Sequence, residues 1–154
     1  MSKKIKIGLS ITTVVLLGFL RDYLFYNINW VYLTLVNNRM NQARKEFYFL
    51  LDWTPAEINV LKFFLTGIFI LLFFIFTAMT LKLLQSIQWN NRILIGTFLI
   101  PGLCAVILAG IGKLTGTYHE LYGAIHTLMS FIQSFLPLMI LGLLFSFLTG
   151  AKVK

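Results

Sequence analysis

The chain has 154 residues, of which 58% are hydrophobic and only 12% charged, and its formal net charge is +8. A composition this apolar excludes an ordinary soluble domain. The basic residues flank apolar runs, where they suit anionic lipid headgroups, so no nucleic-acid partner is expected. Cys104 is the single cysteine, which excludes an intrachain disulfide. The sequence therefore predicts an all-α integral membrane protein with one domain, residues 1–154.

Four uncharged runs predict a four-helix bundle of transmembrane helices. A bilayer core about 30 Å thick needs roughly 20 helical residues at 1.5 Å each, and all the runs but the first reach that length. With their flanks, the runs give expected helices over residues 5–22, 55–84, 92–112 and 120–149. Residues 21–57 would then form an outer connector between the first two helices.

The start of the chain indicates the orientation of the bundle. Lys3, Lys4 and Lys6 directly precede the first apolar run, and no signal-peptidase-like site follows it. A dense basic cluster at the N-terminus favours retention of that end in the cytoplasm. Four crossings would return the C-terminus to the same side, so an N-in/C-in topology is expected.

The connector is rich in aromatic residues, which prefer the headgroup level of a membrane. Residues 23–36 either continue the first helix or form an interfacial helix, and residues 47–53 are expected to return to the membrane surface. Residues 21–27 (RDYLFYN) resemble a segment of small four-span accessory proteins that accompany exosortases. The likeness covers these seven residues and the general topology.

The second helix has a strong start signal. Thr54 is a favourable N-cap, Pro55 suits the first helical position, and Glu57 can close a capping box with Thr54. In the third helix, small residues share one face and predict close helix packing: Gly102, Ala105, Ala109 and Gly112.

Polar residues also gather on one face of the second helix and one face of the fourth. These residues predict a polar groove between the two helices: Asn59, Lys62, His126, Ser130 and Gln133. The alternative is that these side chains only form hydrogen bonds between packed helices. A groove would suit a lipid or a solute, because unpaired ionisable groups at membrane depth are costly.

Charged residues near the expected outer ends of the helices predict a second cluster. Its members are Arg21, Asp22, Glu57, His119 and Glu120. The alternative is that these residues form interfacial salt bridges and extend toward the headgroups.

No catalytic constellation, metal site or cofactor is expected. His119 and His126 would lie about 10 Å apart along one helix, too far for one zinc ion. Both histidines belong to the same expected helix, which excludes bis-histidine haem ligation. No nucleophile lies in register with a base, so the chain is not expected to be an enzyme.

The favoured hypothesis is a small protein of a bacterial cytoplasmic (inner) membrane that acts as a non-enzymatic accessory or scaffold subunit. Its expected partners are the lipid bilayer and other membrane subunits, or further copies of itself. The alternative is a small carrier, or a lipid- or solute-binding membrane protein, that uses the groove between the second and fourth helices.

Overall fold

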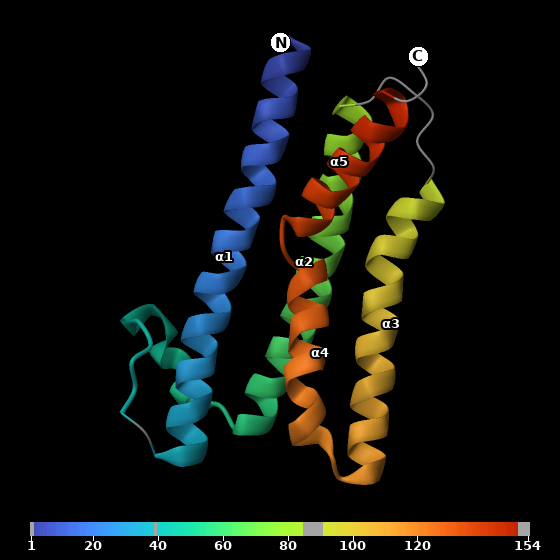
Figure 1. Cartoon of the computed structure of the whole chain (residues 1–154). Helices are drawn as coiled ribbons and strands as arrows, with labels where there is room; N and C mark the ends of the chain where they lie inside the picture. Colours follow the sequence, from blue (N-terminus) through green and yellow to red (C-terminus); the bar gives the residue numbers. More distant parts are fainter. Residues whose placement is uncertain (1, 39, 85–90, 151–154) are drawn as a thin grey trace.

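The computed structural model describes residues 2–38, 40–84 and 91–150, and these residues form helices and connectors without any strand. In this described part of the chain, five α-helices and one 3₁₀-helix follow one another (Figure 1). In chain order they are α1 (Lys3–Asn37), η1 (Lys45–Asp52), α2 (Pro55–Leu84), α3 (Asn91–Thr115), α4 (Tyr118–Ile132) and α5 (Leu136–Gly150).

Three helices, α1, α2 and α3, are long and apolar enough to cross a membrane. The pair α4 and α5 also meets this test when it is taken as one element, but the chain bends by 63° between the two helices. In Figure 1, α4 begins at the end of the bundle where α1 finishes, and α5 finishes at the end where α1 begins. The structure is therefore a helical bundle with three candidate spans and a bent fourth element.

The first helix is longer than the predicted range 5–22, because α1 continues without a break to Asn37. Of the two alternatives for residues 23–36, the structure shows the continuous helix. The side chain of Asn27 links the helix to the connector. Its NH₂ group donates to the Tyr23 carbonyl within α1, and its oxygen accepts from the backbone amide of Arg44 in the connector. Asn38 ends the helix with a left-handed backbone, φ 50°.

The predicted fourth helix over residues 120–149 is wrong as a single element, because it breaks between α4 and α5. Pro137 explains the position of the break. Proline has no amide hydrogen to donate to the carbonyl four residues earlier, here that of Gln133, and its ring clashes with that carbonyl. The hydroxyl of Ser134 supports the break by donating to the Phe131 carbonyl and accepting from the Leu136 amide.

The start of α2 agrees with its predicted capping box. The carboxylate of Glu57 accepts hydrogen bonds from the amide and the hydroxyl of Thr54, at 2.8 and 2.9 Å. The amide of Glu57 donates in return to the Thr54 hydroxyl, at 3.3 Å. The connector before this cap folds back along α1 as η1, which buries Phe47 and Leu50. This packing fixes the turn between α1 and α2.

The helices pack as two hairpins, α1 with α2 and α3 with α4. In the first hairpin, the hydroxyls of Ser10 and Thr80 form a hydrogen bond of 2.6 Å. In the second, the predicted small-residue face of α3 is confirmed at Ala105, which is buried, and at Gly112, which lies against Tyr118 at the start of α4. Between the hairpins, α5 packs on α2.

Gly112→Ala is expected to destabilise the protein, because an added Cβ would lie 2.9 Å from the Tyr118 Cα. Overpacking of this kind costs about 1–3 kcal/mol. Gly110→Ala is the matched control, since no atom lies within 4 Å of its added Cβ. Thermal unfolding in detergent should show a lower midpoint for Gly112→Ala and an unchanged or higher one for Gly110→Ala. Equal midpoints would contradict the close approach of α3 and α4.

Candidate polar site at the helix break

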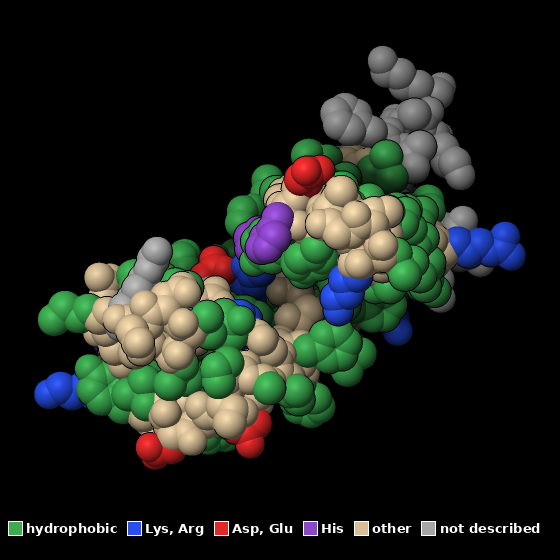
Figure 2. Space-filling view, turned by 90° about the horizontal axis from the view of Figure 1, so that it is seen from below, with side chains coloured by type: hydrophobic (Ala, Val, Ile, Leu, Met, Phe, Trp, Pro, Cys, Tyr) green, Lys and Arg blue, Asp and Glu red, His purple; other side chains and the backbone are tan. Residues whose placement is uncertain are grey.

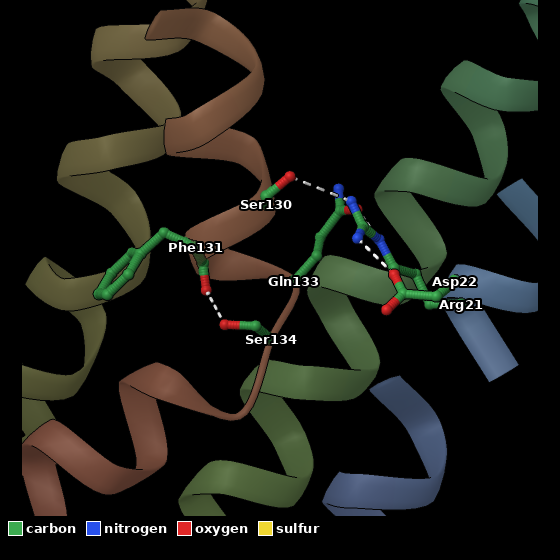
Figure 3. Close-up of polar contacts among 6 residues, drawn as sticks. All are labelled: Arg21, Asp22, Ser130, Phe131, Gln133 and Ser134. Atoms are coloured by element: carbon green, nitrogen blue, oxygen red, sulfur yellow. Dashed lines mark hydrogen bonds and ion pairs between the residues drawn. The ribbon is translucent and has the colours of Figure 1, made fainter. Parts of the chain in front are cut away.

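Four polar side chains from α1 and α4 meet beside the break between α4 and α5 (Figure 3). We call Arg21, Asp22, Ser130 and Gln133 the polar cluster. The guanidinium of Arg21 is its centre: Nε donates to Gln133 Oε1 at 3.1 Å and Nη1 to Asp22 Oδ1 at 2.7 Å. A longer contact of 3.4 Å joins Nη2 to the Ser130 hydroxyl. Arg21 thereby links the two hairpins.

The polar cluster lies halfway along the bundle. Gly18 approaches Phe73 of α2, and the ring of Phe25 contacts Phe69, so Arg21 lies opposite the middle of the uncharged run 63–81. On the other hairpin, Gly102 of α3 approaches Ile132, next to the break, and lies in the middle of the uncharged run 93–112. The contacts between α1 and α2, and separately those between α3 and α4, thus place the polar cluster level with the centres of the two uncharged runs.

A cavity of about 140 Å³ adjoins the polar cluster, between α1 and the α4–α5 break. Arg21, Asp22, Gln133 and Ser134 supply its polar wall. Its apolar wall consists of Val15, Gly18, Phe19 and Phe135. In a bilayer, backbone that leaves a helix is tolerated only where protein buries it or a water-filled cavity adjoins it. The cavity and the polar cluster together satisfy this condition for the break.

The hydrogen bonds of the polar cluster are incomplete at Gln133. Gln133 is 2% exposed, and its Nε2 has no partner among the described residues, although its oxygen accepts from Arg21. A buried donor without a partner costs about 1–3 kcal/mol.

The ion pair of Arg21 and Asp22 is asymmetric. The Arg21 side chain is 17% exposed, whereas the Asp22 side chain is 69% exposed. The guanidinium is thus enclosed by the bundle, and the carboxylate lies on its surface. Viewed from the end where α1 finishes, the surface is divided by a recess in which basic side chains and an acidic side chain are visible (Figure 2).

The two predicted groove residues on α2 lie away from the polar cluster. Asn59 is exposed, and Lys62 is half-buried with its Nζ 4.6 Å from the ring centroid of Tyr32 on α1. Lys62 therefore faces the other helix of its own hairpin.

The three predicted groove residues on the expected fourth helix separate into two groups. His126 is exposed, with its ring centroid 6.0 Å from that of Tyr122 on the same helix. Ser130 and Gln133, one and two turns further along, turn toward Arg21. The polar groove that the structure describes thus lies between α1 and the α4–α5 break. The groove between the second and fourth helices stays a prediction.

The residues of the predicted outer charged cluster also separate. Arg21 and Asp22 pair with each other in the middle of the bundle. Glu57 is in the first turn of α2, and exposed His119 and Glu120 are in the first turn of α4. No group of three metal-ligating side chains occurs among the described residues.

All four members of the polar cluster are predicted site residues, but the predictions placed them at two different sites. Arg21 and Asp22 were expected in the connector because the first apolar run ends at residue 20. The aromatic residues after Asp22 are compatible with a longer helix, and Pro137 signals the break. Together these two features could have placed Arg21 and Gln133 at one depth.

A larger cavity, of about 550 Å³, lies near the start of α2 and is less suited to a specific ligand. Its walls are Trp53, Ala56, Val60, Leu61 and Phe64, with Glu57 as the one charged residue. The carboxylate of Glu57 is already bonded to Thr54 in the capping box. This cavity therefore offers mainly apolar surface, and its one charged group is already part of a helix cap.

The bond from Arg21 to Gln133 is expected to couple the two hairpins energetically. A double-mutant cycle of Arg21→Met and Gln133→Met should give a coupling energy of about 1–3 kcal/mol in the free energy of unfolding. Arg44→Met is the control, because Arg44 lies over the ring of Tyr23 and is not in the cluster. Its cycle with Gln133→Met should be additive within about 0.5 kcal/mol. Denaturation with sodium dodecyl sulfate in mixed micelles measures both cycles, and additivity in both would disprove the link.

Comparison of the chain with protein-family models, with curated protein sequences and with solved structures found no match. The chemistry of the polar cluster and its surroundings is therefore the basis for a functional proposal.

Proposed function

We propose that this protein is an accessory or scaffold subunit of a larger assembly in a bacterial inner membrane. The observation that supports the proposal best is the exposure of Asp22 at the middle depth of an apolar bundle. Lipid tails cannot hydrogen-bond to a carboxylate, and an ionisable side chain at membrane depth costs several kcal/mol unless it is paired or covered. A partner subunit over Asp22 would remove most of that cost.

The surface around Asp22 suits another transmembrane helix. Leu16, Phe19, Tyr23 and Tyr26 are exposed large side chains of α1. They recur at intervals of three and four residues, the spacing that forms one stripe along a helix. A stripe alone would suit lipid equally well. Asp22, which lies at the edge of this stripe, is the feature that favours a protein partner.

A second candidate function is a carrier or a solute-binding protein that uses the cavity beside the break. Discontinuous helices near the bilayer midplane supply backbone groups and helix ends to substrates in several transporter folds. Here the break is at Gln133 and the cavity is about 140 Å³, which suits only a small solute. Such a protein would act without a dedicated partner helix on α1.

A photocrosslinking experiment distinguishes the two functions. A benzophenone amino acid in place of Phe19, next to Asp22 on the exposed stripe, should crosslink to a discrete membrane protein in cells that express the chain natively. The same amino acid in place of Ile107, an exposed residue of α3, should crosslink to lipid. The yield at position 19 should fall at least fivefold with Asp22→Leu, because the partner would lose its polar contact. Lipid adducts alone at both positions would favour the carrier.

The proposal includes the N-in orientation, which the basic cluster at the start of α1 supports. In a Cys104→Ala background, Gln42→Cys lies in the connector and Ser2→Cys at the opposite end of α1. An impermeant maleimide added to intact spheroplasts should label position 42 at least tenfold faster than position 2. Faster labelling of position 2 would reverse the orientation.

A further inference from the structure

We infer that a groove along the first half of α3 binds one acyl chain of an anionic phospholipid, whose phosphate is held by Arg92. The groove has a volume of about 470 Å³ and extends from Arg92 to Pro101, with Phe131 of α4 in its wall. This lipid site is separate from the proposed partner surface on α1, so it adds a function to that contact.

The first observation is the apolar floor of the groove. Gly96 lies between Ile93 and Ile100, which are three and four residues away on the same face of α3. An added Cβ at Gly96 would approach only the Ile100 Cδ1 of the same helix, at 3.8 Å, so no other described element covers this point. The Thr97 hydroxyl already donates to the Ile93 carbonyl at 2.8 Å. The floor is thus a depression between branched side chains, which suits an alkyl chain.

The second observation is the length of the groove, which ends in the middle of the bundle because α4 ends there. Gly102 approaches Ile132, the last residue of α4, and the ring of Phe131 points toward α3 (Figure 3). From Arg92 to Pro101 the groove is about 14 Å long, at a rise of 1.5 Å per residue. One leaflet of a bilayer core about 30 Å thick has nearly the same depth. A partner helix would cross both leaflets, so this length favours a lipid chain.

The third observation is the basic side chain at the outer end of the groove. Arg92 is exposed in the first turn of α3, one groove length from the middle of the bundle. A guanidinium has five N–H donors, so Arg92 can bind a phosphate in addition to the contact that it makes within the protein. Lys82, in the last turn of α2, is a second exposed basic residue at this end of the bundle. The groove therefore joins an apolar floor to a site for a phosphate.

The absence of acidic residues at this end selects the headgroup. All five acidic residues of the sequence lie within residues 22–57 or at Glu120, whereas α1 begins, α2 ends and α3 begins at the end where Arg92 lies (Figure 1). The amine of a zwitterionic headgroup would have no acidic partner there, and a lipid with a net negative charge avoids that repulsion. In the proposed N-in orientation, this end faces the cytoplasmic leaflet, whose surface is negatively charged.

The test compares two phospholipids that have the same acyl chains and different headgroups, phosphatidylglycerol and phosphatidylcholine. Each is added to the full-length protein in dodecyl maltoside micelles. Native mass spectrometry counts the lipids that remain bound, and thermal unfolding in the same micelles measures binding in solution, because a ligand of the folded state raises the midpoint. The wild-type protein should retain one phosphatidylglycerol, with at least fivefold higher occupancy than phosphatidylcholine. Phosphatidylglycerol should also give the larger rise in the midpoint.

Gly96→Leu should lower the retention of phosphatidylglycerol at least fivefold and remove the rise in the midpoint, because the new side chain would occupy the groove. Gly110→Leu is the matched control, since Gly110 is exposed on the same helix, has no atom within 4 Å of an added Cβ and does not line the groove. It should bind as the wild type does. Arg92→Gln should reduce the preference for phosphatidylglycerol over phosphatidylcholine at least threefold. The two glycine variants keep the test valid if Arg92→Gln does not fold.

Equal retention of phosphatidylglycerol by Gly96→Leu and Gly110→Leu would overturn the inference, because the lipid would then bind outside the groove. Equal binding of the two lipids by the wild-type protein would overturn the selection of an anionic headgroup. A second copy of the chain, bound in place of a lipid and lost with Gly96→Leu, would assign the groove to self-association and would also overturn the inference. The photocrosslink at position 19 tests the subunit function separately, since Phe19 does not line this groove.

Discussion

The arrangement of the bundle depends on which groups accept hydrogen bonds from the Arg21 guanidinium in the middle of the bundle. Arg21 lies near the middle of the 35-residue α1, where lipid could not hydrogen-bond to it. The bonds to Gln133 and Ser130 turn this charge toward α4. Pro137 ends the hydrogen-bond ladder of α4 at Gln133, so the break and the arginine occur at the same depth. Arg21 thus finds two polar side-chain partners at the level where α4 ends.

The same bonds leave one side of the polar cluster open. The guanidinium is enclosed between the hairpins, but the Asp22 carboxylate is largely exposed beside a cavity, and the Nε2 of Gln133 is buried without a partner among the described residues. The exposed carboxylate makes this face of α1 different from the purely apolar surfaces of the protein, which lipid can cover. We propose that this asymmetry is the basis of a contact with another membrane subunit.

Local sequence signals predicted much of the fold because their causes act over a few residues. The N-cap at Thr54, the proline after it and Glu57 specify the start of α2, and its predicted range 55–84 agrees with the structure. The small residues of α3 also signalled close packing, which the buried Ala105 shows. The end of α1 was predicted less well, because Arg21 and Asp22 resemble the polar end of a span when only hydropathy is considered.

The sequence by itself determined an all-helical membrane protein, the approximate positions of three long apolar helices and the identities of the four residues in the polar cluster. Only the tertiary structure decided that Arg21 bonds to Gln133, which is 112 residues away. It also decided that Pro137 separates two helices, whereas Pro101 lies inside the continuous α3. The physical reason is that composition and caps act locally, but the partner of a buried charge and the tolerance of a proline depend on which helices pack beside them.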